Sequence, residues 1–232
     1  MTTLRPRDWG GALIALAAAA LFVRLGIWQV HRLSQRRARN AVIAARRALP
    51  PLVVEGRPEV AEPDALADRR VIAHGVFDYG GERLWPGRTY DGTPGVAVLT
   101  PLRLADGSAV YVDRGWVPSP DGVHIDRPAV READTATVAG FAFATPRGRG
   151  DIDVRRLQDS VSYPLLPYVL QQSPRAGGFG RLPYRWPERA LDDGPHLSYA
   201  IQWFSFAAIT LVGTVALLRK AQRERESSRP TI

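Results

Sequence analysis

Two long apolar runs lie near the ends of the chain, and the sequence between them alternates over short distances. The second run is the more regular: residues 197–218 contain no charged side chain, with His196 before them and Arg219 after them. An α-helix of this length, at about 1.5 Å per residue, spans the roughly 30 Å hydrocarbon core of a bilayer. Helices in soluble cores rarely stay uncharged for so many turns. We therefore predict a transmembrane helix over residues 196–218.

The first apolar run covers residues 9–30 and is interrupted by one arginine, Arg24. Its first part is as short as the apolar region of a signal peptide, but more apolar sequence follows Arg24 and no clear small-residue cleavage site is visible. We predict an uncleaved transmembrane helix, with Trp28 in the outer aromatic belt and the Arg24 side chain extended towards the headgroups. An arginine inside a span is also a functional candidate, for example for an acidic group of a ligand.

The intervening sequence predicts a helical arm, a β-rich domain and a linker. Residues 31–51 are rich in arginine and alanine and are expected to extend the first helix as a basic arm that ends at two prolines. Residues 52–172 contain short Val-rich runs separated by Gly, Pro and Asp-Gly, as in strands and turns. Strands are expected over 71–77, 95–102, 109–112, 135–145 and 168–172, with a short helix within 154–167. Residues 173–195, rich in Pro, Gly and Arg, are expected to form the linker into the second span.

The charge distribution predicts the orientation of the two spans. Asp192 and Asp193 precede the second span and basic residues follow it, so the tail, residues 219–232, is expected in the cytoplasm. Residues 1–8 are then also cytoplasmic, and residues 31–195 lie outside. Arginines after the first span oppose this orientation, although long domains are translocated despite such charge. The predicted fold class is a membrane protein in which two transmembrane α-helices flank a β-rich α+β extracytoplasmic domain.

Composition excludes several kinds of chemistry. The chain has no cysteine, which excludes disulfides, Cys-ligated metal sites, a thiol nucleophile and covalent c-type haem attachment. Its one methionine is Met1, so a copper chaperone with soft ligands is not expected. No catalytic motif is present, and we do not expect an enzyme. The basic excess lies beside the spans, which favours contact with membrane lipids and argues against nucleic acid.

One face of the second span carries candidate chemistry. At about 100° per residue, this face contains His196, Ala200, Trp203, Ala207, Thr210 and Thr214, with Tyr199 beside it. Its small residues would let another helix or a flat cofactor approach the backbone closely. In the alternative interpretation, Tyr199 and Trp203 are ordinary interfacial aromatics and His196 only caps the helix.

Three other positions are weaker candidates. His31, at the outer end of the first span, could approach the histidine of the second span, but the pattern does not require them to meet. Arg114, with Trp116, follows a predicted strand and could contact a ligand or a partner, or hold the domain against the membrane. His124 and Asp126 could form half a metal site, although the prolines around them favour a solvated loop.

Four stretches, in order and between two spans, resemble the Surfeit locus protein one family. They are Leu25-Gly-Ile-Trp-Gln29 with Arg32, residues 95–102, Tyr111-Val-Asp-Arg-Gly-Trp-Val-Pro118 and His196-Leu-Ser-Tyr-Ala-Ile-Gln-Trp-Phe204. The stretch after Arg32 carries arginines where many members have a lysine. The resemblance implies a non-enzymatic role in maturing the catalytic subunit of haem–copper cytochrome c oxidase, with haem a bound by some bacterial members.

The family's haem-associated histidine matches His196, so the resemblance implies that His196 is a ligand of the haem iron. We expect further cofactor contacts from Tyr199, Trp203, Trp28, Arg24 and Arg114, with Arg24 near a haem propionate. The expected partner is the oxidase catalytic subunit, and the expected location is a bacterial plasma membrane. Two alternatives remain: a structural chaperone that binds no haem, and a membrane-tethered ligand-binding or sensor domain. The short C-terminal tail counts against the sensor.

Overall fold

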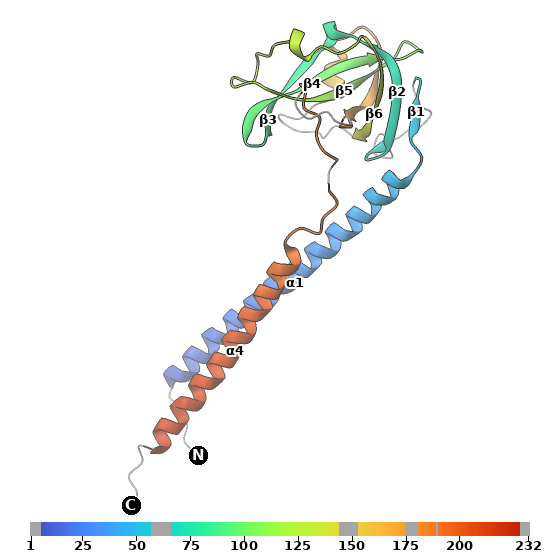
Figure 1. The fold of residues 1–232 in the computed structure, drawn as a ribbon. Coiled ribbons are helices and arrows are strands. Elements are labelled where there is room, and N and C mark those ends of the chain that lie inside the picture. Colours follow the sequence, from blue (N-terminus) through green and yellow to red (C-terminus); the bar gives the residue numbers. More distant parts are fainter. Residues whose placement is uncertain (1–5, 57–65, 144–152, 175–180, 189, 228–232) are drawn as a thin grey trace, which may run out of the picture. The chain divides into compact units, whose positions relative to one another are not determined.

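The computed structural model describes residues 6–56, 66–143, 153–174, 181–188 and 190–227. The chain divides into two compact units. The first unit combines the two ends of the chain, residues 1–42 and 191–232, and the second contains residues 43–190. The first unit is helical and the second is rich in sheet (Figure 1).

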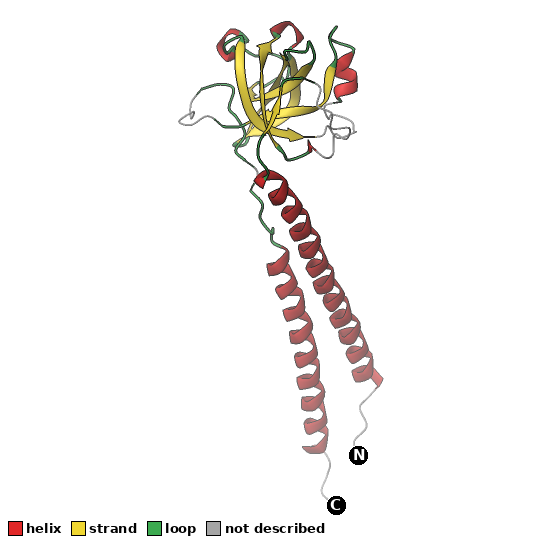
Figure 2. Ribbon diagram, turned by 90° about the vertical axis from the view of Figure 1, so that its right-hand side faces the viewer, coloured by secondary structure: helices red, strands yellow, loops and turns green. Residues whose placement is uncertain are grey.

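Two long helices form the first unit: α1 (Pro6–Ala48) and α4 (His196–Ser227). They lie side by side in both ribbon views (Figure 1 and Figure 2). Both are long and apolar enough to cross a membrane, and only 11% and 6% of their most apolar windows are buried. Proline is tolerated at the first position of a helix but not inside it, which accounts for the start at Pro6 and the end before Pro50 and Pro51.

Small residues let α1 and α4 approach closely. A Cβ atom added at Gly26 of α1 would lie 2.7 Å from the ring of Phe204 on α4. On α4, Ala200 and Ala207 are buried, and Trp203 stacks on Phe22 of α1 with ring centroids 5.8 Å apart. Such close packing holds helices together where lipid supplies no hydrophobic driving force between them.

Ion pairs join the two helical segments at both ends. Arg36 and Arg37 of α1 pair with Asp192 and Asp193, which precede α4, at 2.6 and 2.7 Å. At the other end, Asp8 of α1 pairs with Arg225 of α4. The hydrogen bond from Arg37 lowers the pKa of Asp193 from its ordinary value. The apolar contacts between α1 and α4 therefore lie between ion pairs at both ends of the helix pair.

A closed barrel forms the second unit. Its elements are β1 (Leu52–Val54), β2 (Arg70–Phe77), η1 (Tyr79–Gly81), β3 (Arg83–Tyr90), β4 (Thr93–Arg103), β5 (Ala109–Pro118), η2 (Pro128–Val130), β6 (Thr135–Phe143), α3 (Val154–Gln158) and β7 (Leu165–Gln172). The sheet order is β1-β2-β6-β7-β5-β4-β3, and β2 also pairs with β4. That pairing closes the strands from β2 to β4 into a ring, and Figure 2 shows the sheet curving round on itself. Strands β1 and β3 lie outside the ring.

Two bulges interrupt the pairing of β3, β4 and β5. One lies in β3 between Trp85 and Arg88, and the other lies where β5 passes Ala97 and Leu99 of β4. Each contains a glycine with a positive φ, +72° at Gly87 and +121° at Gly115. Only glycine adopts such angles without strain, so these positions shape the backbone locally.

The structure confirms two apolar helices flanking a sheet-rich domain. The helix expected in the β-rich unit is short, because α3 has only five residues. The helix expected within 154–167 ends at Gln158, and β7 begins three residues earlier than expected. Strand β3 was not predicted, since its Pro86 and Gly87 read as a break rather than a bulge. The last part of the expected strand 135–145, after Phe143, lies outside the described residues.

Candidate functional site

His196 is the first residue of α4, and its side chain is held by α1. Its Nδ1 atom lies 2.9 Å from Oε1 of Gln29, whose side chain is 8% exposed. An amide oxygen only accepts hydrogen bonds, so Nδ1 carries the hydrogen and donates it. The other ring nitrogen, Nε2, then keeps its lone pair. This is the form of imidazole that binds metal ions, and a fixed Nδ1–H is the usual way of orienting such a ligand.

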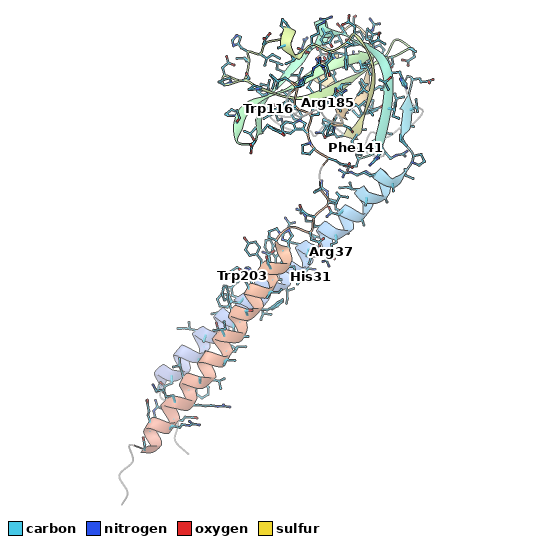
Figure 3. All side chains as sticks on the ribbon, in the orientation of Figure 1. His31, Arg37, Trp116, Phe141, Arg185 and Trp203 are labelled. Carbon is cyan, nitrogen blue, oxygen red and sulfur yellow. The ribbon has the colours of Figure 1, made fainter. Side chains whose placement is uncertain are left out.

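A helix occupies the small-residue face of α4. Trp203 stacks on Phe22, and Phe22 also contacts Phe206 at 5.9 Å between ring centroids. Figure 3 labels Trp203 on α4 and His31 on α1. Since Ala200 is also buried there, this face packs against α1 rather than against a flat cofactor. Of the two occupants that the sequence left open, the structure shows the helix, and the cofactor contact expected from partly exposed Trp203 stays a prediction.

The remaining candidates on the helices are exposed. Trp28 and Tyr199 are 52% and 46% exposed, and Arg24 is also exposed. These side chains stay available to lipid or to a ligand on the outside of the helix pair, so their cofactor role stays a prediction. His31 is exposed as well, and the hydrogen-bond partner of His196 is Gln29 instead.

Arg114 is a buried residue of the barrel rather than an accessible one. Its side chain is 0% exposed and makes ion pairs with Glu82 at 3.2 Å and with Glu132 at 3.0 Å. It also donates to the backbone oxygen of Val130, and its guanidinium lies 5.2 Å above the ring of Tyr79. These contacts hold the barrel together, and the cofactor contact expected from Arg114 stays a prediction that would require their displacement.

Two further arginines complete this cluster: Arg127, whose side chain is 54% exposed, and Arg185, whose side chain is 11% exposed. Arg127 pairs with Glu82, and Arg185 pairs with Glu132 at 2.9 Å. Each buried carboxylate thus has two arginine partners, which offsets the cost of removing its charge from water. Burial lowers the pKa of Arg114, while the nearby carboxylate of Glu82 raises it. We call Arg114, Arg127, Arg185, Glu82 and Glu132 the arginine cluster.

An open cavity of about 440 Å³ lies beside β5, the strand that carries Arg114. Strand β3 contributes Trp85 and Arg88 to its lining, and Asp113 of β5 lines it as well. Burial raises the pKa of Asp113 to about 6, although hydrogen bonds from the Gly115 N–H and the Trp186 side chain act in the opposite direction. A cavity with a buried acid and aromatic walls is the usual form of a ligand site.

The other suggested metal site is not supported. The His124 side chain is 86% exposed and contacts Asp121, three residues before it. Asp126 instead accepts a hydrogen bond from the Ala129 N–H. Within the ranges that the structure describes, no group of three His, Cys, Asp or Glu side chains could hold a metal ion.

The profile of the SURF1 family matches residues 16–208 of the chain. The chain belongs to the SURF1 family. Members of this family are assembly factors for cytochrome oxidase and are not known as enzymes. The suspected resemblance is thus confirmed over residues 16–208, which contain part of each candidate span and the whole barrel between them.

Individual SURF1 relatives align over nearly their full length. A SURF1-like protein of Monosiga brevicollis is 29% identical, and the alignment covers 91% of this chain and 89% of that protein. Uncharacterized SURF1-like proteins of Mycobacterium bovis and Mycobacterium tuberculosis are 28% identical, with 98% of this chain and 90% of theirs covered. The SURF1 architecture therefore extends over both units.

Sequence reasoning did not identify three residues of these sites. Gln29 had a signal, because an amide within an apolar run is unusual and it directly follows Trp28. Glu82 and Glu132 had none. They lie 32 and 18 residues from Arg114 in loops at the ends of short elements, and only the closed barrel brings them together.

Proposed function

We propose that this SURF1 protein is an assembly factor of cytochrome c oxidase that binds haem a through His196 and presents it to the oxidase catalytic subunit. The observation that carries the proposal is the hydrogen bond from His196 Nδ1–H to Oε1 of Gln29. It leaves Nε2 as the electron-pair donor that an iron atom requires. When bound, the haem would supply the redox chemistry, while the protein orients and releases it.

Gln29 acts in this proposal as a positioning residue. A histidine ring turns easily about two bonds, and a partner at Nδ1 selects both its tautomer and its orientation. Since the Gln29 side chain is nearly buried, it cannot easily move away with the imidazole. Loss of such a partner typically weakens metal binding 10- to 100-fold.

The haem plane would contact the exposed side of the helix pair. Helix α1 covers the small-residue face of α4, so the cofactor ring cannot use that face. Trp28 and Tyr199 are exposed aromatic side chains that could stack on a flat ring. Arg24, which is also exposed, would serve a propionate at the same surface.

We further propose that α1 and α4 span a bacterial plasma membrane, with both termini in the cytoplasm and residues 31–195 outside. Arginines after the first span were the main argument against this orientation. Two of them, Arg36 and Arg37, form ion pairs with Asp192 and Asp193, which reduces the positive charge to be carried across. Near the end of α4, the basic residues Arg219, Lys220, Arg223 and Arg225 outnumber the acids Glu224 and Glu226, and this excess suits the cytoplasmic side.

The test is haem binding by the full chain purified in mild detergent. We expect a Soret band and a type-a haemochrome from the wild type, loss of both in His196→Ala, and 10- to 100-fold weaker binding in Gln29→Leu. His31→Ala, which removes an exposed histidine of α1, serves as the matched control and should bind as the wild type does. Thermal unfolding of each variant checks the fold.

The competing function is that of a structural chaperone that grips the oxidase subunit without haem. It is favoured by the packing of α1 over the face of α4 that was expected to hold a cofactor. If no variant, including the wild type, binds haem while oxidase assembly still requires the chain, this second function replaces the first. Oxidase assembly in cells that lack the chain, complemented by His196→Ala, separates the two.

A further inference from the structure

One face of α1 carries arginines that take no part in the pairing of the two helices. Arg32 and Arg39 are exposed, and neither forms an ion pair with another described residue. At about 100° per residue they lie within about 20° of each other, and Trp28 lies about 40° from Arg32 on the same side. Arg36 and Arg37, by contrast, pair with the two aspartates before α4. The basic arm therefore keeps two arginines on one face whose charge is not neutralised within the described residues.

The Arg32 side chain is held by two neighbours on this face. Its guanidinium lies 5.9 Å from the centre of the Trp28 ring, and its Nη1 atom donates to Oε1 of Gln35 at 3.4 Å. An aromatic ring and a neutral amide orient the guanidinium but do not cancel its charge. The planar fork of N–H donors in arginine fits the oxygens of a phosphate group. Arg32 is thus oriented for a phosphate on the outside of the helix pair.

The polarity of this face changes along the helix axis as it does along a phospholipid. Leu21 and Trp28 are exposed on it within the predicted span, and Arg24, which the proposed function assigns to a propionate, lies between them. Arg32 lies about 3 Å beyond residue 30, the predicted end of the span, and Arg39 lies about 14 Å beyond it. A headgroup layer is about 5–8 Å thick, so Arg32 lies within it and the long side chain of Arg39 can extend back towards it. A lipid matches both the apolar and the basic part of this face, whereas an acidic peptide would match only the arginines.

The charge of the face favours an anionic lipid over a zwitterionic one. After Asp8, α1 contains no Asp or Glu, and the next acid in the sequence is Glu55. The ammonium group of a zwitterionic headgroup would therefore find no carboxylate on this face. An anionic headgroup such as glycerol phosphate carries no positive charge that the arginines would repel. Each basic residue close to an anionic membrane surface strengthens binding about fivefold.

We infer that this face of α1 binds an anionic phospholipid, with the phosphate at Arg32 and Arg39 and an acyl chain along Trp28 and Leu21. The inference goes beyond the proposed function, because it requires neither haem nor His196. Such a lipid supplies the negative charge that the arginines after the first span lack within the described residues. It would also fix the depth of α1 at the membrane surface, since the phosphate and the acyl chain occupy different layers of the bilayer.

The test is native mass spectrometry of the full chain in mild detergent with added phosphatidylglycerol or phosphatidylcholine. We expect the first phosphatidylglycerol to bind at least fivefold more tightly than phosphatidylcholine. Its affinity should fall about fivefold in Arg32→Gln and by a smaller factor in Arg39→Gln, which lies farther from the headgroup layer. Arg37→Gln is the matched control and should bind as the wild type does. The Arg37 side chain is 57% exposed on the same arm, but it lies about 140° from Arg32 and pairs with Asp193.

Equal affinity of the wild type for the two lipids, or an unchanged affinity in Arg32→Gln, would overturn the inference. An equal loss in Arg37→Gln would also overturn it, because the total charge of the arm rather than this face would then attract the lipid. Displacement of the lipid by an equal concentration of glycerol phosphate or of hexaglutamate would replace it with a site for free phosphate or for an acidic protein segment. His196→Ala should bind the lipid as the wild type does, so failure here is distinguishable from failure of the proposed function.

Discussion

Replacement of Arg114 by methionine tests whether the arginine cluster holds the barrel together. Methionine has a similar length and no charge, so the packing against Tyr79 is largely kept while both ion pairs are lost. Removing one partner of a buried ion pair costs about 3–5 kcal/mol, because the remaining charge stays buried. Glu82 keeps Arg127, and Glu132 keeps Arg185, which places the expected loss at the lower end, about 3 kcal/mol.

The assay is thermal unfolding of the full chain in detergent, followed by tryptophan fluorescence. A loss of this size lowers the midpoint of barrel unfolding by about 6–12 °C, at about 2–4 °C per kcal/mol. Arg156→Met is the matched control, because the Arg156 side chain is 88% exposed and its described ion pair is with Asp153 at 3.9 Å. This variant should cost less than about 1 kcal/mol. An Arg114→Met barrel within 1 kcal/mol of wild type would refute the reasoning, whereas addition of Glu82→Gln should recover part of the loss.

Three other perturbations have defined outcomes. Gly26→Leu should separate the helix pair, because a Cβ at this position would lie 2.7 Å from the Phe204 ring of α4. Gly213→Leu is the control and should leave the pair intact, because a Cβ there meets nothing within 4 Å. Cross-linking between cysteines introduced in α1 and α4 measures the separation. Gly115→Ala should destabilise the barrel by at least about 2 kcal/mol in urea unfolding, because φ is +121° and the new Cβ would lie 2.3 Å from the Tyr184 oxygen. The folded-state pKa of Asp113, about 6, exceeds its unfolded value, so its ionisation costs stability above pH 6. Lowering the pH from 7.5 to 5 should therefore stabilise the barrel by roughly 1.5 kcal/mol relative to Asp113→Asn, and equal pH dependence of the two proteins would contradict this.

The helices and strands that depend on short stretches of sequence could be predicted from the hydrophobic pattern and the turn residues. The uncharged run after His196 predicted α4, and the arginine-rich continuation after residue 30 predicted that α1 would extend beyond its apolar part. The Val-rich runs 95–102 and 109–112, separated by Asp-Gly, predicted the two strands β4 and β5, which pair with each other. In each case the hydrophobic period or the turn chemistry lies within one short window of sequence.

Features that depend on distant contacts could not be predicted. The pairing that closes the barrel consists of Val76 with Arg103 and Phe77 with Leu102, and neither pair has a local signature. Arg114 looked accessible because charged residues at strand ends usually are; the two carboxylates that allow its burial come from elsewhere in the chain. Likewise, Gln29 can be recognised as the hydrogen-bond partner of His196 only when α4 lies beside α1.

The pairing of α1 with α4 also determines the order in which the protein can be completed. Gln29 and His196 are 167 residues apart, and Asp8 and Arg225 are 217 apart. During synthesis the N-terminal helix therefore waits while the whole barrel is made, with the amide of Gln29 and the groove at Gly26 uncovered. The barrel, whose strands β1 to β7 all lie between the two helices in sequence, can fold in that interval. The His196–Gln29 pair forms only after α4 has been synthesised and has packed against α1. A chain interrupted before α4 would therefore contain a folded barrel and one helix, without the His196 imidazole.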